Sequence, residues 1–164
     1  MNSIPEEISA LSHLAHSLLY LGMDGSPVYS DDLARMSGET FRLSNKLYDS
    51  GVRRDVPEEE AALCLALLMG YNATFCDHGD KQQRIQHVLD RIWAVLPNLP
   101  DTLLKVRLLT YSYGEVYDEE LSQEAHRIID SWSGDTLTAE QVEIIGELKN
   151  IEENPYPFEE ITDN

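Results

Sequence analysis

The sequence predicts an all-α protein, a single compact domain of about seven helices. Segment after segment places apolar residues three and four positions apart, and no stretch alternates apolar and polar residues as a strand does. Residues 61–76 include no charged residue, and the first nine of them are all apolar. A helix of this kind must be covered on every side, but sixteen residues that include Gly70 and Asn72 are too short and too polar to cross a bilayer. We therefore expect a buried central helix.

Capping and turn residues set the predicted ends of the helices. A start is indicated by a side chain that can cap backbone N–H groups, or by proline, which the first helical position tolerates. The predicted starts are, in chain order, Ser3, Ser30 or Asp31, Pro57, Asp80, Pro100, Asp118 and Thr138. Glycine, proline or a polar turn marks each end. The predicted helices span residues 3–21, 30–51, 57–76, 80–96, 100–116, 118–132 and 138–150.

Apolar stripes support these helices one by one. The first helix carries an apolar stripe up to residue 19, and Gly38 weakens the prediction of the second. Three glutamates complement the positive end of the third helix dipole, and the fourth helix has the cleanest helical spacing. The fifth and sixth form a hairpin that faintly repeats the one before it, at an offset of 41 residues that slips to 39. An arrangement of stacked helical hairpins therefore stays open as an alternative for the fold. In the seventh helix we expect Val142, Ile145 and Leu148 to be buried.

The 164 residues suit one helical domain, residues 1–150, followed by an acidic, proline-containing tail, residues 151–164. Cys64 and Cys76 lie about 18 Å apart along one predicted helix, so they cannot form a disulfide with each other. The first seven residues contain no basic residue and no signal-peptide pattern. We therefore expect a cytoplasmic protein.

No residue pattern predicts catalysis, a cofactor or a metal. His13 and His16 are three residues apart, but no third ligand follows at a recognisable spacing. The run from Cys76 to His78 has no partner that would orient a nucleophile, and it is better explained as the end of a helix. The glycines are isolated and form no phosphate-binding loop. We expect no catalytic residue, no cofactor and no metal.

The charge pattern favours a basic protein as the partner. The chain has 12 basic and 30 acidic residues, a net charge of −18, which repels nucleic acids and anionic lipids. We therefore expect no direct nucleic-acid contact and no membrane contact. Residues 108–164 are the most acidic part, with two basic and fifteen acidic residues. The alternative is a solvated acidic surface that only provides solubility.

The predicted binding site lies at the start of this acidic part. Two tyrosines four residues apart share a helix face and are surrounded by acids with no basic residue between them, which is typical of an interface anchor with a polar rim. The predicted protein-binding residues are Tyr113, Glu115, Tyr117, Asp118, Glu119, Glu120 and Glu124. A basic stripe on the second helix is the alternative contact, and it comprises Arg35, Arg42 and Lys46.

Several stretches together resemble the UpxZ family, which antagonises transcription antitermination at capsular polysaccharide loci. These stretches are ISALSHLAHSLLYLG, DGSPVYSDD, EEEAALCLALLMGYNAT, LLKVRLLTYSYGEVYDEELSQEAHRIIDSWSG and LKNIEENPYPFEE. The resemblance implies a regulator acting in trans on NusG-like (UpxY-type) antiterminators, alone or within the RNA polymerase elongation complex. Two other classes stay open: a helical-repeat adaptor with a peptide groove, and an acidic nucleic-acid mimic with carboxylates spaced like phosphates.

Overall fold

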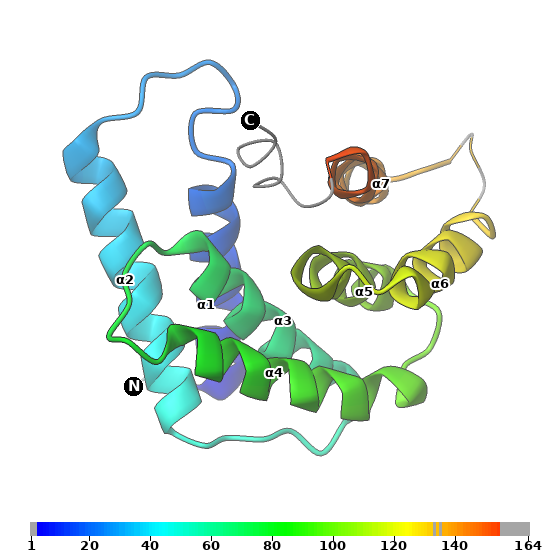
Figure 1. Cartoon of the computed structure of the whole chain (residues 1–164), viewed down its shortest axis with the longest axis horizontal. Coiled ribbons are helices and arrows are strands. Elements are labelled where there is room, and N and C mark those ends of the chain that lie inside the picture. The colour runs from blue at the N-terminus through cyan, green and yellow to red at the C-terminus, as the bar shows by residue number, and fades with distance from the viewer. Residues whose placement is uncertain (1–2, 133, 135, 155–164) are drawn as a thin grey trace, which may run out of the picture. The chain divides into compact units, whose positions relative to one another are not determined.

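Seven α-helices and one short 3-10 helix follow one another in the computed structural model (Figure 1). The structure describes residues 3–132, 134 and 136–154, and no β-strand occurs among them. The elements are α1 (Ile4–Leu19), α2 (Ser30–Asp49), α3 (Pro57–Ala73), α4 (Lys81–Val95), η1 (Leu96–Asn98), α5 (Leu103–Val116), α6 (Glu119–Ile129) and α7 (Ala139–Glu153). The prediction of an all-α fold is confirmed. Helix α7 continues beyond residue 150, and the predicted tail from residue 155 onward lies outside the described residues.

Four helices begin as their sequence signals predict. Ser3, Asp118 and Thr138 each accept a hydrogen bond from a backbone N–H in the first turn of α1, α6 and α7. Thr138 and Gln141 form a complete capping box. Pro57 is the first residue of α3, where its missing N–H costs nothing.

The other three helices begin differently from the prediction. No side chain caps α2, which follows Tyr29. Asp80 precedes α4, but its carboxylate binds Arg84 at 3.0 Å, and Asp77 accepts the first N–H of α4 instead. Helix α5 starts three residues later than Pro100 because Thr102 caps it.

Contacts group the helices into two compact units, residues 1–99 and residues 100–164. In the first unit α3 packs against α1, α2 and α4, and its Leu63, Leu67 and Leu68 are 0% exposed. The prediction of a buried central helix is therefore confirmed. Helix α3 ends at Ala73 rather than Cys76, because the next residue is extended and bonds to α2. Among the described residues, no helix has the length and apolarity that crossing a bilayer requires.

In the second unit α5 packs against both α6 and α7. The prediction for the inner face of α7 is wrong at Val142, which is 57% exposed, while Ile144 is only 3% exposed. Two contacts explain the choice of face. Ile151 lies against Gly114 of α5, and Glu152 accepts hydrogen bonds from α6. Both residues lie on the C-terminal half of α7, beyond the residues that the pattern used.

Candidate functional site

The predicted binding region lies at the corner between α5 and α6. Helix α5 ends at Val116 and is followed by Tyr117, whose backbone is left-handed (φ 54°, ψ 34°) and whose N–H donates to the Tyr113 carbonyl at 2.8 Å. The next residue, Asp118, caps α6 by accepting from the Glu120 N–H at 3.0 Å. A non-glycine residue in the left-handed region costs free energy, so the surrounding contacts must hold it. The two helices are thus joined by two residues of defined geometry.

The two tyrosines of the corner have different exposures. Tyr113 is only 8% exposed, and Tyr117 is half-buried. Their rings meet edge to face with centroids 5.5 Å apart. Tyr113 therefore supports Tyr117 from inside the unit, and only Tyr117 has substantial surface to offer. Val116, 43% exposed, adds an apolar side chain beside it that the sequence analysis did not include.

The predicted acids divide into compensated and uncompensated groups. Glu124 pairs with Arg127, which also binds both carboxylate oxygens of Asp101, at 3.0 and 2.9 Å. Arg127 thereby holds the pKa of Asp101 below its usual value. Glu119 and Glu120 are exposed, and neither has an ion-pair partner within the described part of the chain. Together with the exposed capping residue Asp118, these two carboxylates place accessible negative charge at the corner.

The charge of the chain is unevenly divided between the two units. Residues 100–164 contain four basic and sixteen acidic residues, whereas residues 1–99 contain eight and fourteen. The α5–α6 corner therefore lies in the more acidic unit. A positively charged partner is attracted to this unit before any contact forms.

The alternative basic stripe on α2 is largely neutralised by its own unit. Arg35 lies between Asp32 at 3.8 Å and Glu39 at 3.5 Å. Lys46 pairs at 3.3 Å with Glu7, a buried carboxylate that needs this compensation. Arg42 is exposed and has no ion pair with any described residue. Two of the three predicted cations are thus paired within their own unit, although each side chain is 59% exposed.

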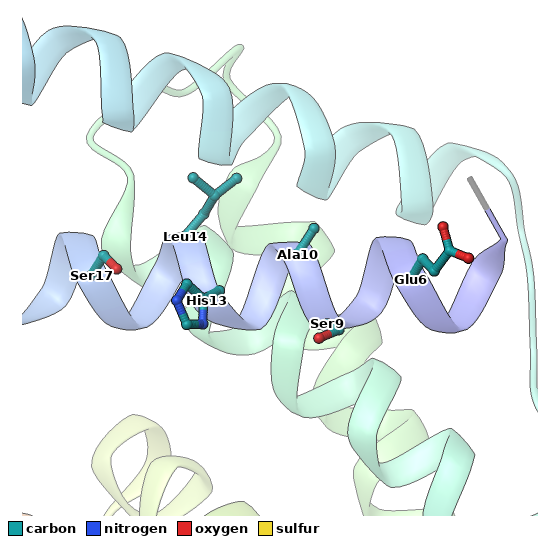
Figure 2. Close-up of a pocket in the computed structure, with 6 residues that line it drawn as sticks. All are labelled: Glu6, Ser9, Ala10, His13, Leu14 and Ser17. Carbon is teal, nitrogen blue, oxygen red and sulfur yellow. The ribbon is translucent and has the colours of Figure 1, made fainter. Parts of the chain in front are cut away.

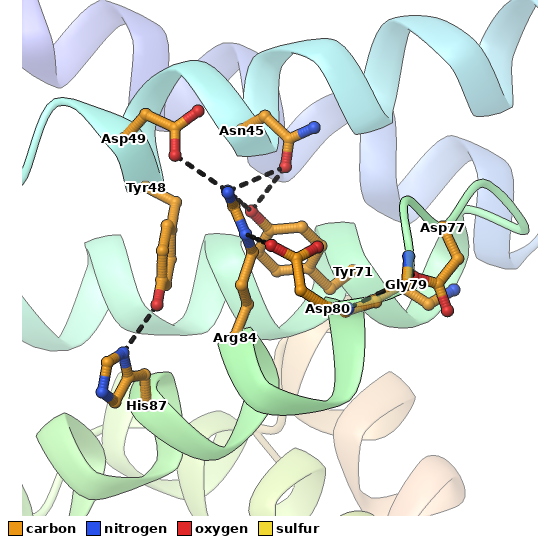
Figure 3. A network of polar contacts seen from close by, with 10 residues as sticks. Asn45, Tyr48, Asp49, Tyr71, Asp77, Gly79, Asp80, Arg84 and His87 are labelled. Carbon is orange, nitrogen blue, oxygen red and sulfur yellow. Dashed lines mark hydrogen bonds and ion pairs between the residues drawn. The ribbon is translucent and has the colours of Figure 1, made fainter.

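A polar network around Arg84 joins three helices of the first unit (Figure 3). Its guanidinium bonds to Asp80, Asn45, Asp49 and the Tyr71 hydroxyl at 3.0 to 3.2 Å and lies 4.4 Å from the centre of the Tyr48 ring. Burial raises the pKa of Tyr71 to about 12, so its hydroxyl stays protonated and donates to Asn45 at 2.8 Å. These contacts, made through Nε and Nη1, link α2, α3 and α4.

Two hollows are formed by described residues of the first unit. One, of about 380 Å³, adjoins the Arg84 network where the Tyr48 hydroxyl meets His87 Nδ1 at 2.6 Å. The other, of about 620 Å³, lies along the outer face of α1, where Glu6, Ser9, Ala10, Leu14 and Ser17 line it together with His13 (Figure 2). His16 is not among its lining residues and packs on the Tyr20 ring instead, with centroids 4.5 Å apart. The two histidines therefore have different surroundings.

The run from Cys76 to His78 has structural partners. Cys76 Sγ lies 3.7 Å from the Ser37 hydroxyl, and the His78 ring meets Phe41 edge on with centroids 4.8 Å apart. Across the described residues, no group of three or more His, Cys, Asp or Glu side chains is arranged to hold a metal. The absence of a metal stays a prediction.

Comparison with known proteins gives one family and one solved structure. The sequence profile of the UpxZ family of transcription anti-terminator antagonists matches residues 8–114. A crystal structure of a transcription anti-terminator antagonist UpxZ from Bacteroides uniformis ATCC 8492 is 48% identical in sequence and has a TM-score of 0.88. The match covers 97% of this chain and 98% of that one. No curated protein matches the chain.

Proposed function

Because the chain belongs to the UpxZ family of transcription anti-terminator antagonists, we propose that it inhibits NusG-like (UpxY-type) antiterminators of capsular polysaccharide operons in trans. It does so in the cytoplasm by binding the antiterminator, free or within the RNA polymerase elongation complex, and not by catalysis. We further propose the α5–α6 corner as its contact surface.

The main support for this surface is that two carboxylates without ion-pair partners lie beside exposed apolar side chains at the turn between α5 and α6. Glu119 and Glu120 are exposed and unpaired among the described residues, while Val116 and Tyr117 supply adjoining apolar area. Acidic residues around an aromatic side chain form the rim and the anchor of many protein interfaces. A surface of this kind fits a basic patch that encloses an apolar recess on the partner.

Binding kinetics with a purified NusG-like antiterminator from another capsule locus test the proposal. Rim charges act mainly on the encounter rate, so Glu119→Lys with Glu120→Lys should slow association about ten-fold at low salt and flatten its salt dependence. Tyr117→Ala should instead speed dissociation, at a cost of about 1–3 kcal/mol. The matched control is Asp55→Lys with Asp90→Lys, which makes the same change in net charge at exposed positions of the other unit.

The same assay distinguishes the two candidate surfaces. If Arg42→Glu abolishes binding while the Glu119 and Glu120 reversals behave like the control, the contact lies on α2 and the proposed corner is wrong. If the unmodified chain binds no antiterminator, direct inhibition itself is wrong. A cellular reporter of antitermination, read with the same variants, shows whether loss of binding also means loss of inhibition.

A further inference from the structure

Phe75 is a large apolar side chain that the fold leaves in water. It follows α3 directly and is 62% exposed, although the preceding Thr74 is only 2% exposed. A single exposed apolar residue is ordinary on a protein surface. Phe75 differs because the backbone that carries it is held in place by buried polar groups.

Hydrogen bonds hold the backbone on both sides of Phe75. The Phe75 N–H donates to the hydroxyl of Ser37 at 3.0 Å, and Ser37 is 0% exposed. The Thr74 hydroxyl donates to the Ser37 carbonyl at 2.9 Å and accepts from the Cys76 N–H at 3.1 Å. The two hydroxyls lie 2.8 Å apart, so the Ser37 hydroxyl can donate to that of Thr74 and leave every group satisfied.

The segment after Phe75 is held as well. Asp77 accepts a hydrogen bond from the N–H group of Gly79 at 2.7 Å (Figure 3). It also accepts one from the N–H group of Lys81 at 3.2 Å. The Lys81 ammonium reaches back and donates to the Thr74 carbonyl at 2.9 Å. Residues 74–81 thus form a closed frame, and none of these bonds involves the Phe75 ring.

A rigid exposed aromatic ring suits a binding anchor for two reasons. Little conformational entropy is lost when the ring is buried, because its backbone is already ordered. A phenylalanine also removes a large apolar area from water when it enters a pocket. Folding does not account for the ring, since serine, threonine and backbone groups supply the frame.

The charge beside Phe75 indicates the chemistry of the partner. The N–H groups of Gly79 and Lys81 hold the pKa of Asp77 below its usual value, so this carboxylate is ionised at neutral pH. It is exposed and has no ion pair within the described residues. Residue 75 also lies inside the part of the chain, residues 8–114, that matches the family. A partner shared by the family can therefore contact it.

We infer that Phe75 is an anchor that inserts into an apolar pocket of the antiterminator, with a cationic side chain of that partner facing Asp77. This inference rests on the proposed function and adds a second contact to the same complex. Phe75 and Asp77 belong to the other unit, so this contact uses none of the residues of the α5–α6 corner.

The test measures binding of Phe75→Ala to the same purified antiterminator. We expect the Kd to rise about 10- to 100-fold through faster dissociation, with association little changed. The control is Trp93→Ala, which removes a 36% exposed aromatic ring from α4 in the same unit. Phe75→Ala should keep the wild-type thermal melt, since the ring is 62% exposed, and Phe75→Leu should retain part of the affinity.

A photo-crosslinking amino acid in place of Phe75 adds a second readout. A crosslink to the antiterminator supports the inference, whereas a crosslink only to a second copy of this chain overturns it. Unchanged affinity of Phe75→Ala, alongside weakened binding by the Glu119 and Glu120 reversals, overturns the anchor and leaves the proposed function intact. If the unmodified chain binds no antiterminator, the proposed function fails first and the anchor fails with it.

Discussion

Replacing Gly70 by alanine tests how closely the central helix approaches its neighbours. Gly70 lies in α3, and a Cβ atom built there would meet the Ser44 hydroxyl of α2 closer than real Cβ atoms approach any other atom. It would also lie 3.0 Å from Leu11 Cδ1 of α1. Ser44 is 0% exposed, and its hydroxyl has no hydrogen-bond partner among the described residues. Gly70 thus marks the point where three helices meet.

Two opposing terms set the size of the effect. Alanine is favoured over glycine in a helix by about 1 kcal/mol. Overpacking a close contact costs about 1–3 kcal/mol. Gly38 of α2 provides the matched control, since nothing lies within 4 Å of a Cβ atom built there. Both substitutions gain the higher helix propensity of alanine, but only Gly70→Ala pays the overpacking cost. Gly70→Ala should therefore be less stable than Gly38→Ala by about 1–3 kcal/mol.

A double-mutant cycle assigns the cost to a particular atom. Ser44→Ala removes the nearest clashing atom and a buried unsatisfied hydroxyl, so it should be neutral or stabilising by itself. In that background Gly70→Ala should lose much of its penalty, and the remainder reports the contact with Leu11. The expected coupling between residues 44 and 70 is about 0.5–3 kcal/mol.

Thermal melts followed by circular dichroism measure all four variants. For a chain of this size about 1 kcal/mol corresponds to a Tm change of about 2–4 °C. Gly38→Ala should melt above the parent protein and Gly70→Ala below Gly38→Ala. If Gly70→Ala raises the Tm as much as Gly38→Ala does, the close approach of α3 to α1 and α2 at residue 70 is wrong.

Two further predictions concern buried titratable groups. Burial opposes the charge of Glu60, but bonds from Arg91 and the Arg54 N–H hold its pKa below the usual 4.5. Its stabilisation is therefore present above about pH 4.5 and is lost as the pH falls through the lowered value. In urea titrations at pH 7, Arg91→Met should cost about 3–5 kcal/mol. Between pH 7 and pH 3 the free energy of unfolding of this variant should fall less than that of the wild type. An equal fall in both proteins would refute the coupling between Glu60 and Arg91. Separately, burial raises the pKa of the Cys64 thiol to about 12, while Cys76 is half-buried. Iodoacetamide at pH 8 should thus alkylate only Cys76 until urea unfolds the chain, as mass spectrometry can show, and labelling of Cys64 in the folded protein would contradict this.

The sequence by itself determined the fold class and the order of the helices. Both depend on signals that lie within a few residues of one another, such as the apolar run of α3 and the capping box at Thr138 and Gln141. It also singled out Glu119 and Glu120, from the density of acidic residues beside two tyrosines, and both are exposed in the first turn of α6.

Only the tertiary structure decided which side chains are available at the surface. Arg127 pairs with Glu124 in its own helix, but only folding also brings it to Asp101, 26 residues away in sequence. The polar network around Arg84 likewise depends on α2 residues up to 39 positions away. The hydrogen bonds that hold the Phe75 backbone depend on Ser37, which is 38 positions away. The local periodicity of the sequence cannot predict such pairs, because their interaction energy depends on distances that are set only when the helices pack together. For the same reason α7 turned Ile144 inward and left Val142 in water: Ile151 and Glu152 find partners on α5 and α6 only in the folded unit.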